Sequence, residues 1–195
     1  LVVVAEAPAG AFTLVPRDGA ATAPTAAATL AQPDDVSMVL HTSGTTSRPK
    51  IVPLSQRNLC ASARNIAKSL QFRADDRGLN VMPLFHIHGL VGALLASIAA
   101  GGSVVCCPGF NDRRFFDWVH EFQPTWYTAV PTIHQAVAAQ CQQYRQKAPD
   151  HQFRFIRSSS SSLPAATMKA LETLTGAPVI EAYSMTEAAH QMTSN

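Results

Sequence analysis

The sequence predicts an α/β fold with a largely parallel sheet flanked by helices. From Val36 to the end of the chain, short β-branched or aromatic runs alternate with longer segments of helical periodicity, which is the pattern of β-α-β units. The 195 residues are 47% hydrophobic and 14% charged, so the chain can bury a core and differs from a disordered protein. Some hairpin content is expected between residues 40 and 54.

The expected strands are apolar or β-branched runs bounded by turn residues. They cover residues 1–4, 12–15, 36–41, 51–54, 79–82, 103–107, 125–129, 153–157 and 179–183. The run 36–41 is apolar enough to predict a buried strand.

The expected helices cover residues 55–70, 89–100 and 112–122, a segment that begins at Pro131, and residues 164–176. Ser55 and Asp112 are the expected N-caps, and Gly101 and Gly176 follow the C-terminal ends. The first helix would bury Leu59, Ala63, Ile66 and Leu70, and the core would hold Phe115, Phe116, Trp118 and Trp126.

Three segments are expected along the chain. Residues 1–18 would form partial N-terminal strands, residues 19–33 an Ala/Thr/Pro-rich loop, and residues 34–195 the main core. The chain begins at Leu1 rather than Met and stops without an end signal, so we expect a fragment of a longer protein.

Charge and cysteine content exclude several classes. The net charge of +2, from 15 Lys and Arg against 13 Asp and Glu, is too balanced for nucleic-acid binding. The apolar run 89–102 is shorter than the about 20 residues of a membrane span, and no signal peptide is visible. The cysteines lack CxxC spacing, which favours an intracellular, cytoplasmic location, with a peroxisomal one open for a eukaryotic source. The oligomeric state stays open.

In open α/β sheets, ligands bind beyond the carboxyl ends of the strands. The loops to inspect are therefore 42–50, 83–88, 130–132, 158–163 and 184–190. The first loop reads Thr42-Ser43-Gly44-Thr45-Thr46-Ser47-Arg48-Pro49-Lys50. Its hydroxyls, backbone N–H groups and cations suit phosphate oxygens, although it lacks the second Gly of a Walker A loop. From composition alone, a solvated Ser/Thr turn is an equal alternative.

Three ordered motifs resemble the signatures of the adenylate-forming (AMP-binding) superfamily. The loop 42–50 is similar to its Thr-Ser-Gly-Thr-Thr-Gly-x-Pro-Lys sequence, Met82–His86 to its proline-leucine-phenylalanine-histidine segment, and Glu181–Glu187 to its aromatic-x-x-Thr-Glu motif. The resemblance implies that the chain from about Val36 is part of the large N-terminal domain of an acyl-CoA synthetase.

The resemblance also implies a reaction in two halves. A carboxylate attacks the α-phosphate of ATP, giving an acyl-adenylate and pyrophosphate, and the thiol of coenzyme A then displaces AMP. Mg²⁺, lysine and hydroxyl donors would stabilise the charge that develops on the phosphoryl oxygens.

By the same resemblance, Thr186 would contact the α-phosphate, Glu187 would bind Mg²⁺, and Tyr183 would lie against adenine. An ordinary carboxylate at a helix N-terminus is the alternative for Glu187. The β- and γ-phosphates would be held by Thr42, Ser43, Gly44, Thr45, Thr46 and Lys50. The remaining nucleotide-binding residues would be Ser160, Ser161, Ser162, Glu181, Ala182, Ser184 and Met185. The residues expected to act in catalysis are Lys50, His86, Thr186 and Glu187.

The serine run 158–162 stands where most relatives have Ser-Gly-Gly-Ala-Pro-Leu. Its hydroxyls fit a small polar acid better than a fatty chain, because buried unpaired hydroxyls cost about 1–3 kcal/mol each. Ser162 as a helix N-cap is the plainer alternative.

Two histidines narrow the resemblance. His190 lies three residues beyond Glu187, and the two would share a face if residues 186–192 were helical. The chain resembles the oxalate–CoA ligase branch at Ser47, at Phe85–Gly89 and at 125–135, 155–158 and 190. In that branch, the histidines that match His86 and His190 contact oxalate.

Other residues receive plainer interpretations. His86 and His88 form a His-x-His pair, but no clustered ligands accompany it, so we do not expect a metal pair there. His134 is expected to be structural.

The chain departs from the family pattern at 51–53, which reads Ile-Val-Pro where Gly-Val is usual. It also ends before the family's ribose-binding Asp, hinge and C-terminal domain, so the isolated chain is expected to turn over poorly. An adenylation domain that loads a carrier protein and a non-catalytic nucleotide-binding module stay open as alternatives.

Overall fold

The computed structural model describes residues 2–3, 12–13, 30–42, 49–148 and 150–195. The chain divides into two compact units, Leu1–Ala31 and Gln32–Asn195. In the first unit, β1 (Val2–Val3) pairs antiparallel with β2 (Phe12–Thr13). Both strands lie inside the ranges predicted from the sequence.

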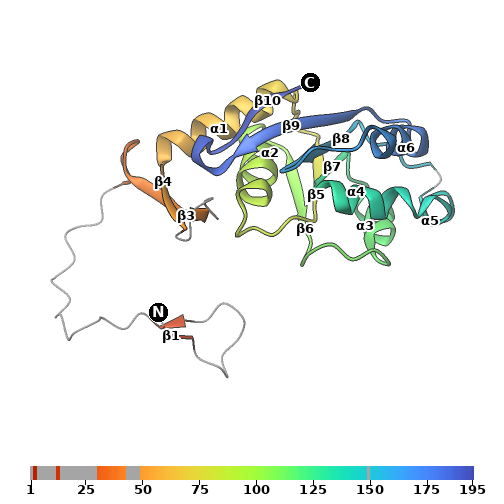
Figure 1. The fold of residues 1–195 in the computed structure, drawn as a ribbon, viewed down its shortest axis with the longest axis horizontal. Helices are drawn as coiled ribbons and strands as arrows, with labels where there is room; N and C mark the ends of the chain where they lie inside the picture. The colour runs from red at the N-terminus through yellow and green to blue at the C-terminus, as the bar shows by residue number, and fades with distance from the viewer. Residues whose placement is uncertain (1, 4–11, 14–29, 43–48, 149) are drawn as a thin grey trace. The chain divides into compact units, whose positions relative to one another are not determined.

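The second unit is built on a sheet of six strands within its described residues, in the order β10-β9-β8-β7-β5-β6 (Figure 1). The strands are β5 (Arg77–Asn80), β6 (Ser103–Cys106), β7 (Trp126–Ala129), β8 (Phe155–Ser159), β9 (Val179–Met185) and β10 (His190–Ser194). Every pairing is parallel except that of β10 with β9. The predicted α/β class with a largely parallel sheet is confirmed.

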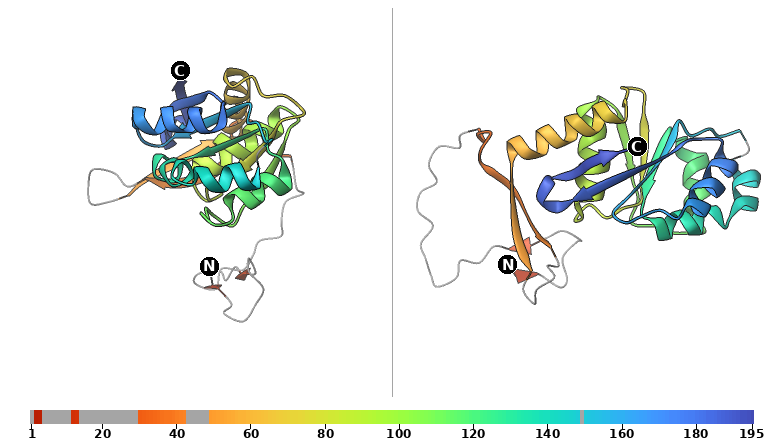
Figure 2. Two further views of the ribbon diagram at one scale, coloured as in Figure 1. Left: turned by 90° about the vertical axis from the view of Figure 1, so that its right-hand side faces the viewer. Right: turned by 45° about the horizontal axis from the view of Figure 1, so that its top comes forward.

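Helices cover both faces of this sheet. They are α1 (Gln56–Ser69), the π-helix η2 (His88–Leu95), α2 (Ala96–Ala99), α3 (Phe115–Phe122), α4 (Pro131–Ala138), α5 (Cys141–Lys147) and α6 (Ala165–Thr175). Figures 1 and 2 show α1 and α2 on one side of the strands and α3 to α6 on the other. Within the described ranges, no helix combines the length and the apolar character that a membrane crossing requires.

Along the central strands, side chains alternate between the two faces of the sheet, and each face packs its own hydrophobic core. Trp126 stacks on Phe155 with ring centroids 5.3 Å apart, on the side of α1 and α2. Tyr127 and Ile156 point to the opposite side, where they pack among residues of α3 to α6. Successive side chains of a strand point to opposite faces, so both faces of these parallel strands are buried. The aromatic residues predicted for the core, Phe115, Phe116, Trp118 and Trp126, are all buried.

Several helix ends agree with the predictions. Ser55 caps α1 by accepting a hydrogen bond from the Asn58 N–H, and Leu59, Ala63, Ile66 and Leu70 are buried as expected. Gly101 and Gly176 both adopt positive φ after helix ends, a conformation that glycine tolerates best.

The predicted Asp112 cap is wrong, and so is the alternative in which Ser162 is an N-cap. At the start of α3, Asn111 Oδ1 accepts from the N–H groups of Arg113 and Arg114, because α3 begins three residues later than predicted. The helix α6 begins directly after Pro164, whose fixed φ suits a helix start, so Ser162 lies in the preceding loop and does not cap it.

Strand positions also shift by about two residues. The predicted strand 79–82 is β5 at Arg77–Asn80, because the Asn80 side chain accepts from the Met82 N–H and turns the chain out of the sheet. Similarly, β8 ends at Ser159 rather than 157. The helix α5 was not predicted, since its polar sequence carries little periodic signal.

The predicted hairpin is present as β3 (Val36–Thr42) and β4 (Lys50–Ser55). The prediction that residues 36–41 form a buried strand is wrong, since Val36 is 61% exposed and Val39 51% exposed. The physical reason is that β3 pairs with β4 rather than joining the six-stranded sheet, while Val52 and Leu54 of β4 supply the buried face.

Candidate functional site

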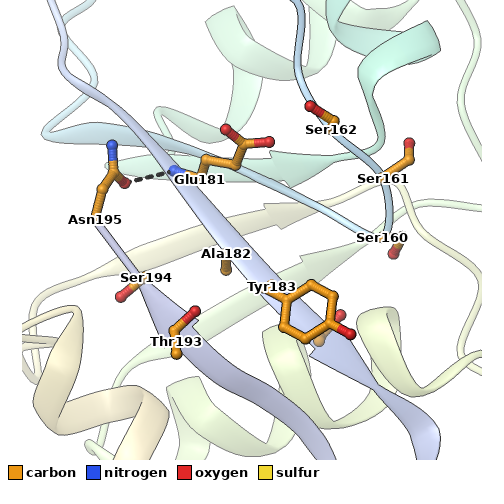
Figure 3. Close-up of a pocket in the computed structure, with 10 residues that line it drawn as sticks. Ser160, Ser161, Ser162, Glu181, Ala182, Tyr183, Thr193, Ser194 and Asn195 are labelled. Carbon is orange, nitrogen blue, oxygen red and sulfur yellow. Dashed lines mark hydrogen bonds between the residues drawn. The ribbon is translucent and has the colours of Figure 1, made fainter.

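A cavity of about 480 Å³ opens beside the ends of β8, β9 and β10 (Figure 3). Hydroxyl groups and one carboxylate line much of it. The lining residues are Ser160, Ser161, Ser162, Glu181, Ala182, Tyr183, Ser184, Thr193, Ser194 and Asn195. The serine loop and the third motif, which are about twenty residues apart in sequence, therefore meet in one cavity. Tyr183 is 64% exposed, and its ring lies at the cavity beside the serine loop.

Hydrogen bonds tie the serine loop to β9. Glu181 Oε1 accepts from the Leu163 N–H at 2.8 Å. Ser159 Oγ donates to the Ala182 carbonyl at 3.0 Å and lies 3.1 Å from Ser184 Oγ. The cavity wall is thus held in place by the fold rather than left to a loose loop.

Ser160, an exposed residue of the cavity wall, has a strained backbone. Its φ is +79°, in the left-handed region that glycine prefers. Its hydroxyl lies 3.0 Å from His88 Nδ1, and this hydrogen bond links the cavity to a buried polar group.

We expect Ser160→Gly to change stability by less than about 1 kcal/mol. Removing the Cβ from a left-handed residue relieves about 1–2 kcal/mol of strain, while losing the hydroxyl gives up a hydrogen bond worth about 0.5–1.5 kcal/mol. Urea unfolding measures the balance. Ser161→Gly is the matched control, since Ser161 also lines the cavity but is not among the residues with positive φ. A loss above about 2 kcal/mol from Ser160→Gly alone would contradict the strain argument.

The segment after β9 reverses direction, so the helix over 186–192 that would place Glu187 and His190 on one face is not formed. Thr186–Ala188 forms one 3₁₀ turn, η3, and Ala189 and His190 then adopt φ of +53° and +106°. Ser62 Oγ of α1 donates to the Ala189 carbonyl at 2.6 Å, which supports this reversal. Because the chain returns as β10, Glu187 stays exposed while His190 becomes fully buried, so the two do not share a helix face.

Beneath η2, four buried side chains and the half-buried Gln191 form a polar group that we call the histidine–arginine cluster: His88, Thr128, Arg157, His190 and Gln191. Arg157 Nη2 lies 3.3 Å from His190 Nδ1 and 2.8 Å from Gln191 Oε1, and Nη1 lies 3.4 Å from Thr128 Oγ1. His88 Nε2 lies 2.7 Å from Thr128 Oγ1, and the His88 and His190 rings are 5.2 Å apart. The cluster adjoins the cavity through the bond of His88 to Ser160.

The cluster carries positive charge without an acid. Arg157 is fully buried and forms no ion pair with any described residue, and desolvation lowers its pKa to about 9. Desolvation, and then the charge of Arg157, hold the pKa values of His88 and His190 well below the usual range. Within the described ranges, Arg157 Nε and His190 Nε2 are buried without a hydrogen-bond partner. Such a set suits an anion that the protein does not itself supply.

The two histidines predicted to bind the acid have different environments in the structure. His190 is fully buried, whereas His86 is exposed and its Nδ1 accepts from the His88 N–H at 3.1 Å. It is His88 that packs against His190. Sequence reasoning assigned no role to His88 or Arg157, although a lone arginine inside the otherwise uncharged strand Phe155–Ser159 was a signal.

The phosphate loop is only partly described. Thr42 and Lys50 are opposite each other in the β3–β4 ladder, and Lys50 is exposed. Ser43, Gly44, Thr45 and Thr46 lie outside the described residues. The two ends of the predicted phosphate loop therefore meet at one end of the hairpin.

The structure is an α/β domain with a largely parallel sheet and a hydroxyl-lined cavity that follows the carboxyl end of β8 and runs along β9 and β10. Residues 2–195 match the family described as AMP-binding enzyme, and the chain belongs to this family. The resemblance to the adenylate-forming superfamily is confirmed.

Similar proteins with curated names are acid–CoA ligases. The chain is 47% identical over 165 residues to the oxalate–CoA ligase of Saccharomyces cerevisiae, covering 85% of this chain and 30% of that protein. It is 46% identical over 168 residues to the oxalate–CoA ligase of Arabidopsis thaliana, covering 84% and 32%. The chain thus spans about a third of the length of these relatives.

A solved structure shares the fold. The ATP-bound MatB of Rhodopseudomonas palustris superimposes with a TM-score of 0.74 at 32% identity, over 84% of this chain and 32% of that one.

Proposed function

We propose that the complete protein to which this chain contributes is an ATP-dependent acid–CoA ligase acting on oxalate or another small carboxylic acid. The observation that carries the proposal is the histidine–arginine cluster, a buried cationic group without a carboxylate among the described residues. The two oxalate–CoA ligases to which the chain is similar support the choice of acid.

The nucleotide would occupy the cavity and the loops beside it. Tyr183 would lie against adenine, Thr186 would donate to the α-phosphate, and Thr42–Thr46 with Lys50 would hold the outer phosphates. Glu187 fits Mg²⁺, because its exposed carboxylate leaves the other coordination positions to water and phosphate oxygens. Bound Mg²⁺ would neutralise charge on the phosphoryl oxygens.

The chemistry would proceed in two displacements. A carboxylate oxygen of the acid attacks the α-phosphorus and pyrophosphate leaves, giving the acyl-adenylate. The thiol sulfur of coenzyme A then attacks the acyl carbon, loses its proton, and displaces AMP. The part of the protein described here would contribute positioning and charge stabilisation.

The residues proposed to bind the acid favour a substrate that is small and doubly charged. The serine wall and the cluster offer several hydrogen-bond donors in a short distance. An aliphatic chain would leave these groups unpaired, at about 1–3 kcal/mol each, whereas a dianion can accept from donors at both ends.

The test uses the complete gene product with MgATP, coenzyme A and acids from oxalate to long-chain fatty acids. We expect oxalyl-CoA as the dominant product by mass spectrometry, and a 10- to 100-fold rise in the KM for oxalate in His190→Gln, because a hydrogen bond to a charged group is worth about 1.5–3 kcal/mol. The KM for ATP should not change. A dominant medium- or long-chain acyl-CoA would exclude the proposed acid, and the absence of pyrophosphate release with every acid would favour a binding module.

A second candidate keeps the adenylation step but changes the acceptor. The matching chain covers about a third of its relatives, so a carrier-protein thiol in place of coenzyme A is compatible with the described residues. Transfer of the acyl group to coenzyme A in the same assay separates the two.

A further inference from the structure

Arg157 can only donate, and this property fixes the state of its neighbour. A guanidinium has five N–H donors and no acceptor. The 3.3 Å contact between Arg157 Nη2 and His190 Nδ1 therefore requires Nδ1 to accept. In the neutral imidazole, which the low pKa of His190 implies, the proton must then be on Nε2.

The other nitrogen of His190, Nε2, is a donor whose hydrogen-bonding capacity the described residues leave unused. Nε2 is buried and has no hydrogen-bond partner among the described residues. It lies under η2, where a Cβ on Gly92 would be only 2.9 Å from it. The imidazole cannot turn freely, because η2 is above it and Arg157 and His88 are beside it.

Arg157 is itself oriented by polar neighbours. Gln191 Oε1 accepts from Nη2 at 2.8 Å, and Gln191 Nε2 donates to Ser69 Oγ of α1 at 2.9 Å. Thr128 Oγ1 accepts from Nη1 at 3.4 Å. These contacts come from β7, β10 and α1, so the guanidinium has a fixed position relative to His190.

We propose that Arg157 is a positioning residue for acid recognition: by donating to His190 Nδ1 it holds the imidazole in the Nε2–H form, so that His190 presents a donor to the substrate carboxylate. Without this donor, the two neutral tautomers would exchange, and one of them would direct a lone pair at the anion. The identity of the ligand in this inference rests on the proposed function. The tautomer of His190 rests on the geometry alone.

The first experiment measures the tautomer directly. The complete protein is labelled with ¹⁵N-histidine, long-range ¹H–¹⁵N correlation spectra are recorded without substrate, and His190→Gln assigns the signals. We expect a protonated Nε2 and an unprotonated Nδ1 at His190. A protonated Nδ1 in the unsubstituted protein would overturn the proposal, and this measurement needs neither a variant at Arg157 nor turnover.

The second experiment removes the donor. In Arg157→Met we expect the His190 signals to show a mixture of tautomers, the KM for oxalate to rise at least tenfold, and the KM for ATP to stay within twofold. Retention of the pure Nε2–H form in Arg157→Met, or an unchanged KM for oxalate, would also overturn the proposal.

Arg154→Met is the matched control for general destabilisation. Arg154 precedes β8 and forms an ion pair with Asp76, away from the cluster. It should lower the melting temperature and leave both the tautomer and the KM for oxalate unchanged. If no acid is activated by the unsubstituted protein, the proposed function fails while the tautomer measurement still tests the role of Arg157.

Discussion

Lowering the pH from 7 to 5 is expected to destabilise the fold by more than about 2 kcal/mol, a large share of the whole stability of a typical domain, about 5–15 kcal/mol. His88, His134 and His190 are fully buried. Desolvation lowers the pKa of His134 to about 4 and holds the pKa values of the other two well below their usual range.

The direction follows from which state binds the protons. Below the ordinary histidine pKa of 6.5, the unfolded chain takes up a proton at each site while the folded chain does not. Stability is therefore complete above this pH and falls with the pH until the folded pKa is reached. Each extra proton costs about 1.4 kcal/mol per pH unit, so the His134 site alone gives about 2 kcal/mol over about 1.5 units. The lowered pKa values of His88 and His190 act in the same direction and add to this loss.

Urea unfolding at pH 7 and pH 5 measures this loss of stability, and the His134→Gln variant shows how much of it comes from His134. His134 accepts from the Tyr127 hydroxyl at Nδ1 and donates from Nε2 to the Arg157 carbonyl, so it lies outside the candidate acid site. The variant should be less stable at pH 7 but lose about 2 kcal/mol less than the parent between the two pH values. Equal unfolding midpoints of the parent at pH 7 and pH 5 would contradict the account.

The order of strands and helices could be predicted because each element carries its own local signals. The Ser55 cap, the apolar face of α1 and the glycines after helix ends all depend on neighbours within a few residues. Of the loops predicted at the carboxyl ends of the strands, 158–163 and the start of 184–190 meet at the cavity, whereas 83–88 and 130–132 do not line it.

What could not be predicted depends on contacts between distant residues. A helix over 186–192 was considered only as a condition for Glu187 and His190 to share a face. The Ser62 hydroxyl of α1 and the pairing of β10 with β9 stabilise a reversal instead. This reversal buries His190 against Arg157, a pair separated by 33 residues in sequence. Which of His86 and His88 lies beside His190 also depends on the tertiary structure. His88 is the first residue of η2 and is buried, whereas His86 precedes η2 and is exposed.

Asp76→Ala is expected to destabilise the protein by about 3–5 kcal/mol, because it removes one partner of a largely buried ion pair. Asp76 Oδ2 accepts from Arg154 Nη2 at 2.6 Å and from the Arg73 N–H at 2.8 Å, while Oδ1 accepts from Arg154 Nε and from the Thr125 hydroxyl. Desolvation alone would raise the pKa of Asp76, but the bonds from Arg154, Arg73 and Thr125 overcome it and the pKa lies below 3.8. The carboxylate therefore stabilises the fold fully above pH 3.8, and its contribution is lost only as the pH falls through the lower folded value.

A double-mutant cycle with Arg154→Met separates this pair from its surroundings. Asp76→Ala leaves the Arg154 guanidinium half-buried without its anion, and Arg154→Met removes that unpaired charge. The double variant should therefore be less destabilised than the sum of the two single variants, by about 0.5–3 kcal/mol. Urea unfolding at pH 7 measures the four species. Strict additivity would contradict the assignment, because it would mean that the bonds from Arg73 and Thr125, rather than the ion pair, account for the stabilisation by Asp76.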